Sequence, residues 1–465
     1  MTVDLAIVGA GPAGMAAAAL AAELGLATLV IDAEAAPGGQ IYRAVEGAAE
    51  NSPLGADYLA GRGLAAALRA SAAQYRPGTT VWHIDPAAPQ GAALSMIADG
   101  VSETVTARRI LLATGALERP VAIPGWTLPG VMTAGAAQIL LKSAGIVPDG
   151  RAVLAGQGPL LALIALQLAR AGAPPALVLQ TTPRRNYAAA ARHLGALWPG
   201  RLEIARGAAL PLGLRRHGIA VRRGVRGLRA LGRDRLEAVA WAGGEVAADH
   251  LFLHEGVIPD TQISRGLELA HAWDAAQLCW RPVTDAWGGS SLPTVAVAGD
   301  AAGIAGAEAA ALTGRLAALD AAARLGHLGA AERDRRAAPL RAGLRRARAI
   351  RPLLDALYRP PAAVFAPEDA VILCRCEEVT AGQIRRAVRL GAPGPNQVKA
   401  FTRCGMGPCQ GRMCGPLVTA LIAGERGVPV AEIGPYRPRA PYKPLTLGAL
   451  AGAQFATEEA STSPR

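Results

Sequence analysis

Two segments of the chain, about 150 residues apart, share one order of apolar and glycine-rich positions. The first has an apolar strand over Asp4–Val8, a glycine-rich turn, a small-residue helix over Met15–Leu24 and a second strand over Thr28–Ile31. The second segment repeats the strands at Ala152–Ala155 and Ala176–Leu179. Short buried strands that alternate with helices predict parallel sheets built from βαβ units. The expected class is α/β, with two dinucleotide-binding domains.

The turn after the first strand has the spacing of a dinucleotide-binding motif. Gly9 permits a tight turn, Gly11 lets a pyrophosphate approach the backbone, and Gly14 allows the helix to pack closely on the strand. The N–H groups at the helix N-terminus then hold the phosphates. Asp32 ends the second strand, where it can accept hydrogen bonds from an adenosine ribose. The predicted contacts at this turn are Gly9, Gly11, Pro12, Ala13, Gly14 and Asp32.

Three further motifs decide between FAD and NAD at this first site. Ile110–Gly115 is a strand that ends in Ala-Thr-Gly, and Thr294–Asp300 is a strand that ends in Gly-Asp before another helix. Both resemble two-domain flavoprotein reductases, in which the Gly-Asp carboxylate holds the flavin ribityl chain. Pro37–Gln40 is similar to the segment beside the flavin in thioredoxin-reductase-like proteins. The resemblance implies FAD, and it adds the contacts Gly39, Gln40, Ala113, Thr114, Gly115, Gly299 and Asp300.

The second glycine-rich turn departs from the first. Gly156 and Gly158 are predicted nucleotide contacts, but Leu161 stands in place of the third glycine. The second strand ends in Gln180 rather than an acid, which leaves a preference for the NAD ribose open. The pair Arg184–Arg185 fits either a 2′-phosphate or an ordinary charged surface. NADP(H), ATP and no ligand are therefore all retained as occupants of this second site.

The positions of the six cysteines separate two kinds of redox chemistry. None precedes Cys279, and five lie between residues 374 and 414. Disulfide reduction needs two thiols within bonding distance, so the absence of a pair near the flavin motifs argues against it. Cys279 is expected to be a buried small side chain. The clustered five predict a metal site in a reducing compartment.

The cysteine cluster has the pattern of a small thiolate cage. A Cys-x-Cys pair is followed by a glycine-rich run from Cys404 to Cys414. Thiolates are soft ligands for iron–sulfur clusters and zinc, and a flavin in the same chain favours a redox cluster because zinc carries no electron. We expect a 2Fe–2S cluster, with zinc as the alternative. The predicted ligands are Cys374, Cys376, Cys409 and Cys414, with Cys404 as the extra thiol.

Composition narrows the possible partners. The net charge is +12, and nearly all of the basic residues are arginine, with lysine only at 142, 399 and 443. The arginines between residues 315 and 348 follow a helical stretch rather than a tight basic run, so solvated helix faces are favoured over a partner-facing surface. Aromatic residues make up 4% of the chain, which argues against a stacking surface for nucleic acid.

Neither a targeting segment nor a membrane span is expected. Met1–Asp4 leads directly into the first strand without a basic stretch. The uncharged stretch Ala152–Ala169 is long enough to suggest a span, but it contains the turn Gly156–Pro159, which predicts a βα unit instead. The expected location is the cytoplasm.

The whole chain resembles the flavin- and iron–sulfur-containing subunits of opine oxidases, D-hydroxyproline dehydrogenase, archaeal proline dehydrogenase and hydrogen cyanide synthase. The segments that carry the resemblance are Gly38–Arg43, Gly125–Met132, Gly299–Ala307 and Thr402–Cys414. It implies two Rossmann-like dinucleotide-binding domains of the two-domain flavoprotein reductase type. Thr402–Cys414 also resembles a bacterioferritin-associated-ferredoxin-like 2Fe–2S domain, whose second cysteine pair matches Cys409 and Cys414 and leaves Cys404 as the spare.

The same resemblance implies a division of labour between subunits. In such complexes a separate subunit, similar to glycine and D-amino-acid oxidases, removes the hydride from an amine carbon. This chain would relay the electrons through its cluster and FAD to an acceptor that the sequence does not identify. Its own residues agree, because we predict no catalytic base or nucleophile near the flavin motifs. Each histidine is expected to be structural: His83, His193, His217, His250, His254, His271 and His327.

The expected organisation combines these units in order. The Pro-rich segment Pro435–Pro444 should run extended, and the apolar residues after it, to Leu450, would suit packing across a neighbouring domain or subunit. The predicted domains are 1–120 with 285–330 for FAD, 121–284 for the second nucleotide, 331–369 as a helical linker, 370–430 for the 2Fe–2S cluster and 431–465 as an extended tail.

Two other functions stay open on the sequence. The chain would be a self-contained NAD(P)H-dependent FAD oxidoreductase that reduces a protein partner, if Arg184–Arg185 bind NADPH. It would be a scaffold for the catalytic subunit, if its cofactors are structural.

Overall fold

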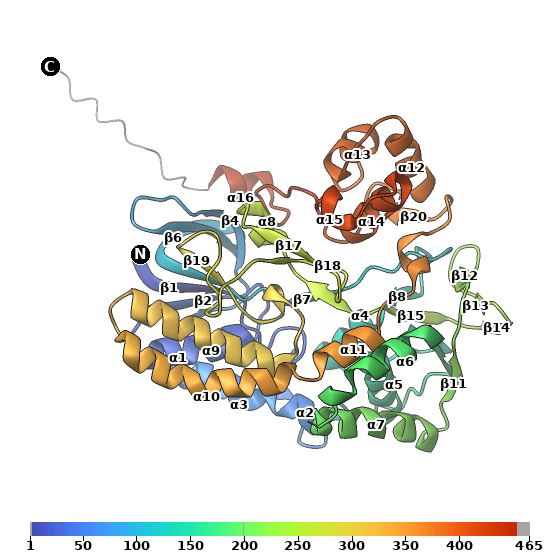
Figure 1. The fold of residues 1–465 in the computed structure, drawn as a ribbon, viewed down its shortest axis with the longest axis horizontal. Coiled ribbons are helices and arrows are strands. Elements are labelled where there is room, and N and C mark those ends of the chain that lie inside the picture. Colours follow the sequence, from blue (N-terminus) through green and yellow to red (C-terminus); the bar gives the residue numbers. More distant parts are fainter. Residues whose placement is uncertain (1, 199, 453–465) are drawn as a thin grey trace.

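The first of two large sheets contains the N-terminal strand, and it is mixed, with parallel strands around β1 and an antiparallel β4-β5-β6 edge. We describe the fold from a computed structural model, which covers residues 2–198 and 200–452. The strand order is β3-β2-β1-β6-β5-β4, and β19 pairs with β6 (Figure 1). The strands are β1 (Thr2–Val8), β2 (Thr28–Ile31), β3 (Gln74–Arg76), β4 (Thr80–Asp85), β5 (Ala92–Ala98), β6 (Val101–Leu112) and β19 (Val295–Val297).

The predicted FAD motifs meet at one edge of this sheet. Val8 pairs in parallel with Ile31 of β2 and with Leu112 of β6. In β19, Val297 pairs with the same Leu112. The carboxyl ends of parallel strands share an edge, which is where ligands of such sheets bind. The glycine turn, Asp32, the Ala-Thr-Gly turn and the Gly-Asp turn therefore come together although they are far apart in sequence.

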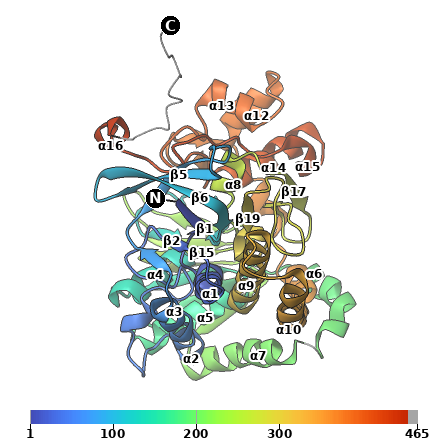
Figure 2. The same ribbon diagram turned by 90° about the vertical axis from the view of Figure 1, so that its left-hand side faces the viewer.

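Two helices of small residues pack closely beneath this edge. They are α1 (Pro12–Glu23) and α9 (Ala307–Arg324), and α10 (Ala330–Arg348) covers the other side of α9 (Figure 2). A Cβ on Gly314 of α9 would lie 2.1 Å from the Ala13 carbonyl oxygen, so the close approach of α9 to α1 requires glycine there. The approach brings the N-termini of both helices to the same edge of the sheet.

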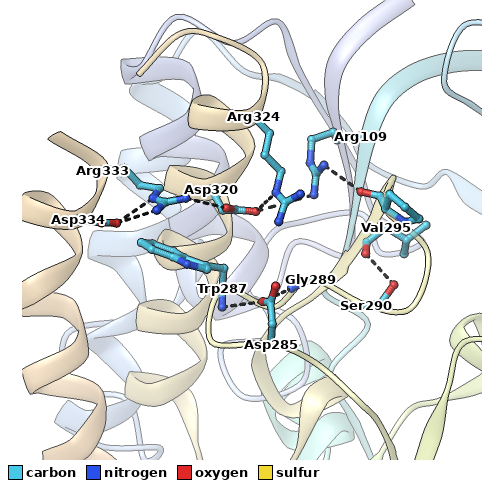
Figure 3. Close-up of polar contacts among 11 residues, drawn as sticks. Arg109, Asp285, Trp287, Gly289, Ser290, Val295, Asp320, Arg324, Arg333 and Asp334 are labelled. Atoms are coloured by element: carbon cyan, nitrogen blue, oxygen red, sulfur yellow. Dashed lines mark hydrogen bonds and ion pairs between the residues drawn. The ribbon is translucent and has the colours of Figure 1, made fainter. Parts of the chain in front are cut away.

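A buried carboxylate ties α9 to the sheet and to α10 (Figure 3). Asp320 is 3% exposed and accepts hydrogen bonds from Arg324 at 2.6 Å and from Arg333 of α10 at 3.4 Å. Arg109 of β6 lies 4.0 Å from the same carboxylate, and the Arg333 guanidinium stacks 4.3 Å from the Trp287 ring centroid. Part of the arginine excess is therefore used inside the fold.

The second sheet is entirely parallel, in the order β11-β10-β9-β15-β8. Its strands are β8 (Val131–Thr133), β9 (Ala152–Gly156), β10 (Leu177–Gln180), β11 (Ala220–Arg223) and β15 (His250–His254). The helices of this unit are α4 (Ala134–Ala144), α5 (Pro159–Arg170), α6 (Arg184–Ala190) and α7 (Arg201–Arg216). A small antiparallel sheet adds β12 (Arg229–Leu231), β13 (Ala238–Trp241) and β14 (Gly244–Ala247).

The two strands that connect the first and second units pair with each other. β7 (Ala116–Glu118) leaves the first unit and β16 (Val257–Pro259) returns to it, and the two are antiparallel neighbours. Shorter elements complete the two units: α2 (Ala56–Leu59), α3 (Gly61–Ala70), α8 (Gln262–Gly266), β17 (His271–Asp274) and β18 (Cys279–Pro282).

The cysteine cluster belongs to a small helical unit with its own core. After α11 (Arg351–Leu357) come β20 (Ile372–Cys374), β21 (Val379–Thr380), α12 (Ala381–Arg389), α13 (Pro395–Thr402), α14 (Gly415–Arg426) and α15 (Val430–Ile433). Thr380 and Gln383 form a reciprocal capping box that starts α12. Trp126 of the second unit donates a 2.7 Å hydrogen bond to the Ile372 carbonyl oxygen, which joins the two units.

The C-terminal segment returns to the first sheet. Residues 434–446 contain no helix or strand, and α16 (Leu447–Ala451) then contacts β6 (Figure 1). Residues 453–465 of the predicted tail lie outside the described residues. Within residues 2–198 and 200–452, no helix is long and apolar enough to cross a membrane.

Candidate functional site

The first glycine turn leaves no space for side chains. Gly9 has φ +106°, and a Cβ on Gly14 would lie 1.8 Å from the Gly9 carbonyl oxygen. Helix α1 begins at Pro12, where the missing N–H removes no helical hydrogen bond. Since a helix N-terminus attracts anions, the turn has the geometry for a pyrophosphate.

Asp32 lies beside this turn at the end of β2. Its carboxylate accepts hydrogen bonds from the Ala10 N–H and, at 2.8 Å, from the Glu34 N–H. Burial raises the pKa of this carboxyl, and the two backbone hydrogen bonds oppose that shift. The buried Tyr75 hydroxyl, whose ionisation is disfavoured by burial and by the charge of Asp32, has no hydrogen-bond partner among the described residues. A buried hydroxyl without a partner beside a carboxylate fits a ribose-bearing ligand.

The Pro37–Gln40 segment lies directly against the glycine turn. The Gly38 N–H donates a 2.8 Å hydrogen bond to the Ala10 carbonyl oxygen, and a Cβ on Gly39 would lie 2.9 Å from the Gly11 Cα. Glycine at position 39 is therefore required for this contact. The structure thus places the segment beside the predicted pyrophosphate turn.

Lys142 is a site residue that sequence reasoning missed. Its Nζ donates to the Gln40 carbonyl oxygen at 3.0 Å and to Gln138 Oε1 at 2.9 Å, and the residue is 8% exposed. Burial and the charge of Arg43 lower the pKa of Lys142 to about 7. The available signal was composition, because Lys142 is one of three lysines in an arginine-rich chain.

The Gly-Asp turn brings a second helix N-terminus to the site. The Gly299 N–H donates a 2.9 Å hydrogen bond to Thr313 Oγ1 in α9. Asp300 Oδ1 accepts hydrogen bonds from the N–H groups of Ala305 at 2.8 Å and Gly306 at 3.1 Å, directly before α9 begins. The carboxylate is thereby fixed at the edge where β6 and β19 end, which fits its expected role toward a ribityl chain.

The Ala-Thr-Gly turn is joined to the crossing from the second unit. Thr114 Oγ1 donates to the Asp260 carbonyl oxygen at 3.0 Å, and the Asp260 N–H donates to the Gly115 carbonyl oxygen at 2.9 Å. The buried amide of Gln262, two residues on, has no partner among the described residues. Unpartnered buried polar atoms at Gln262 and Tyr75 are what a bound polar cofactor would satisfy.

The second glycine turn is similar in backbone and different in chemistry. Gly156 and Gly158 have φ values of +141° and +93°, and a Cβ on Gly156 would lie 1.8 Å from the His254 carbonyl oxygen. Gly158 has open space around its Cβ position, as a ligand-facing glycine requires. Arg184–Arg185 lie exposed on α6.

A buried acid that sequence reasoning missed lies at this second turn. Glu255 is 3% exposed and accepts a 2.6 Å hydrogen bond from Thr181 Oγ1, next to Gln180. Burial raises the pKa of Glu255 to about 7, and the Thr181 hydrogen bond opposes that shift. The Gln157 amide lies beside this carboxyl without a well-formed hydrogen bond among the described residues.

The cysteines divide into two groups. The sulfur atoms of Cys374, Cys404 and Cys414 lie within 4.8 Å of one another and are buried. Cys376 and Cys409 contact each other and are more exposed. Hydrogen bonds from the Cys404 and Cys414 thiols lower the pKa of Cys374, which favours the thiolate that metals bind. The structure therefore gathers two of the four predicted ligands together with Cys404, and leaves the other two as a neighbouring pair.

Cys279 is separate from this cluster. It is 4% exposed, and burial raises its pKa to about 12, which makes it unreactive. No other cysteine precedes residue 374. The first two units thus lack the pair of thiols that disulfide reduction requires.

Comparison with known families identifies both cofactors. A family model for pyridine nucleotide-disulphide oxidoreductases matches residues 3–324, and a model for the BFD-like [2Fe-2S] binding domain matches residues 372–424. The chain therefore binds FAD and carries a 2Fe–2S cluster in its C-terminal unit, as predicted. The α/β fold class with an appended iron–sulfur domain is confirmed as well.

Similar proteins cover almost the whole chain. An opine oxidase subunit from Agrobacterium tumefaciens (strain Ach5) is 44% identical over 463 residues, which span 96% of this chain and 91% of that protein. Hydrogen cyanide synthase subunit HcnB from Pseudomonas protegens is 33% identical and spans 97% of each chain. The crystal structure of L-proline dehydrogenase from P. horikoshii has a TM-score of 0.73 at 19% identity, over 97% of this chain and 80% of that one, which shows a shared fold.

The chain combines a flavin-binding oxidoreductase fold with a cysteine-rich iron–sulfur domain, and its sequence has no cysteine pair before residue 374. It belongs to the pyridine nucleotide-disulphide oxidoreductase family, as a flavin and iron–sulfur oxidoreductase subunit related to HcnB and to the opine oxidase protein.

Proposed function

We propose that this chain is the electron-transfer subunit of a multi-subunit amino-acid or opine-type dehydrogenase. It relays electrons from an amine-oxidising flavoprotein subunit, similar to amino-acid oxidases, through its FAD and 2Fe–2S cluster to an acceptor. The observation that carries the proposal is a flavin and a one-electron cluster in one chain that has no cysteine pair beside the flavin motifs. The cofactors supply the redox chemistry, and the protein supplies their position and electrostatic surroundings.

Two histidines, the buried His254 and the half-buried His271, support this division of labour, because both are engaged in contacts that hold the fold. His254 is buried against Glu118 at 2.5 Å. His271 bonds to the Leu269 carbonyl oxygen and to Ser264, and burial lowers its pKa to about 4. His271 is therefore not placed as a base that exchanges protons with a substrate near neutral pH, and His254 is occupied by its contact with Glu118.

The names of the full-length relatives support the need for a partner. Both are described as subunits, one of opine oxidase and one of hydrogen cyanide synthase. We extend that arrangement to this chain, with the substrate-binding residues on the partner. We also propose the cytoplasm as its location, since clustered free thiols suit a reducing compartment.

The cofactor contacts follow from the geometry of the two sites. For FAD we propose the glycine turn, Asp32, Gly39–Gln40, the Ala113–Gly115 turn and the Gly299–Asp300 turn. For the cluster we retain Cys374, Cys376, Cys409 and Cys414. Cys404 is fully buried and donates a hydrogen bond to Cys374, which fits a thiol that supports a ligand.

Alanine replacement of single cysteines tests this ligand set. Cys409→Ala should lose the cluster, because three thiolates and no fourth ligand hold it poorly. Cys404→Ala should retain it, at a cost of about 1 kcal/mol for a small buried side chain. Iron and sulfide analysis with the visible spectrum measures both. Loss of iron from Cys404→Ala with retention in Cys409→Ala would exchange these two cysteines in the ligand set.

The relay is tested by the source of electrons. The purified chain is mixed anaerobically with NADH or NADPH, and separately with an amine or opine substrate and the partner subunit. We expect the flavin absorbance to bleach only in the second mixture. Rapid bleaching by NAD(P)H alone would instead establish a self-contained reductase. In that case Arg185→Ala would test whether NAD(P)H binds beside α6. Arg185 lines a cavity of about 530 Å³ there, together with Arg192 and Arg359.

A further inference from the structure

The segment between the iron–sulfur unit and α16 is fixed at both ends by a buried tyrosine. Tyr436 is 2% exposed inside the iron–sulfur unit, and Tyr442 is 4% exposed inside the core of the FAD unit. We refer to Tyr436–Tyr442 as the strap. Figure 1 shows the chain running from α15 past α8 to α16 along this path.

Tyr436 is built into the cysteine loop. Its hydroxyl donates a 3.0 Å hydrogen bond to the Cys404 carbonyl oxygen. A Cβ on Gly405 or on Gly411 would lie 2.8 Å from the Tyr436 ring, so the loop accepts this ring only because glycine stands at both positions. The Lys399 ammonium lies 5.9 Å from the ring centroid. Tyr436 therefore belongs to the structure that surrounds the cluster.

Tyr442 is built into the FAD unit in the same manner. Its N–H donates a 2.9 Å hydrogen bond to the Trp82 carbonyl oxygen of β4. The ring packs with Leu267 and Leu269, and a Cβ on Gly266 would lie 2.2 Å from it. A buried aromatic side chain with a matched glycine is a specific anchor rather than an incidental contact.

The residues between the anchors are also attached. The Arg437 N–H donates to Asn396 of α13 at 3.1 Å, and its guanidinium pairs with Glu268 of the FAD unit at 3.1 Å. Beyond Tyr442, burial and the charge of Arg412 lower the pKa of Lys443, whose charge also interacts with Asp260 and Glu34.

The strap limits how far the two units can separate. Six residue steps span at most about 20 Å when fully extended, so two fixed ends hold the units within that range. Domains in one chain otherwise move relative to each other when their interface is small. Other contacts that hold the iron–sulfur unit include Trp126 against Ile372, Ala122 in its core and α15 against β17.

We propose that the strap holds the iron–sulfur unit in its electron-transfer position against the FAD unit, with Tyr442 as the positioning residue. The inference rests on the proposed relay function. In the step concerned, one electron passes between the reduced flavin and the oxidised cluster, which oxidises the flavin by one electron and reduces the cluster by one. The strap takes no part in that chemistry and sets only the separation and orientation across which it occurs.

The test measures how fast electrons redistribute between the two centres in the holoprotein. A flash-generated deazaflavin radical injects one electron, and the flavin and cluster absorbance bands are followed. Tyr442→Ala should slow the redistribution by about tenfold or more, because a loosened tether lowers the effective concentration of one centre at the other. Tyr442→Phe keeps the ring and the backbone hydrogen bond and should match the native chain. Both midpoint potentials should stay unchanged in both variants.

A cleavable strap separates positioning from folding. A protease recognition sequence is inserted between the exposed residues Arg439 and Ala440, so that Tyr436 and Tyr442 both keep their anchors. Cutting the folded protein should slow redistribution while FAD and iron content stay constant. Equal rates in the native chain, in the uncut insertion variant and after cutting would overturn the proposal, because the remaining contacts between the units would then suffice.

A second readout does not depend on the relay. Hydrogen exchange of the α15 and β17 amides should accelerate after cutting, since these elements face each other across the two units. Unchanged exchange would contradict the strap even in a chain that transfers no electrons. Accelerated exchange in a chain without flavin-to-cluster transfer would support the strap and refute the relay.

Discussion

The two nucleotide-binding units share a backbone plan and differ in the polar groups at its edge. In the first, Asp32 lies at the end of β2 and two helix N-termini converge on the ligand edge. In the second, the corresponding strand ends in Gln180, and the acid comes instead from Glu255 after β15. Burial leaves that acid with a pKa of about 7. The βαβ frame therefore specifies where a ligand can lie, and the residues at the strand ends specify which ligand.

The strongest test of this comparison is the packing of the first turn. Gly14→Ala should abolish FAD binding and cost about 3 kcal/mol or more, because its Cβ would lie 1.8 Å from a carbonyl oxygen that cannot move away. Gly63→Ala in α3 is the matched control. Nothing lies within 4 Å of that Cβ, so the change should be neutral or stabilise the helix by up to about 1 kcal/mol. The flavin-to-protein ratio and urea unfolding measure both, and FAD retained by Gly14→Ala would refute the assignment.

Replacement of Asp32, at the end of β2, should have the next largest effect. Asp32→Ala should weaken FAD binding by about a hundredfold, since it removes both the ribose acceptor and the partner of two buried N–H groups. Gln180→Ala, at the corresponding place in the second unit, should leave FAD affinity unchanged. Titration of the apoprotein with FAD by fluorescence quenching compares them. An equal loss from the two substitutions would mean that the units do not divide the ligands as proposed.

Glu255 gives a smaller, pH-dependent difference between the units. Its pKa is raised on folding, so the native state loses stability as pH rises from the usual glutamate range to about 7 and no further above it. Glu255→Gln removes this loss and should stabilise the chain by on the order of 2 kcal/mol at about pH 8, with little change at about pH 4.

Exposed Glu245 in the same unit supplies the control for that measurement. Glu245→Gln should shift the urea midpoint little at either pH, because a solvated carboxylate gains little from neutralisation. If Glu255→Gln changed the stability of the chain by the same amount at both pH values, this carboxyl would be ionised in the folded protein without a penalty.

Local motifs made the first site predictable from the sequence. The glycines and Asp32 have a fixed spacing within one βαβ unit, and each of the other two turns directly follows an apolar strand. The register of β1, β2, β6 and β19 brings them together. Glu255 was not predictable, because its partner Thr181 lies 74 residues away and neither has a motif. Lys142 and the two strap tyrosines were missed for the same reason, since burial and a matched glycine arise only from tertiary packing.

The cysteine loop was predictable from the sequence only in part. Spacing predicted a thiolate cage, and the family model confirms a 2Fe–2S domain over residues 372–424. Spacing did not predict that Cys404 would lie with Cys374 and Cys414, because five thiols within one glycine-rich loop can be grouped in more than one way. Tyr436 packs against the glycines of this loop and donates a hydrogen bond to the Cys404 carbonyl oxygen.

The most direct test of the account is an anaerobic absorbance and EPR spectrum of the purified chain before and after dithionite. We predict flavin bands in the oxidised protein and, after reduction, a rhombic signal from one 2Fe–2S cluster per chain. Flavin bands with stoichiometric zinc in place of iron, and no EPR signal on reduction, would contradict the relay.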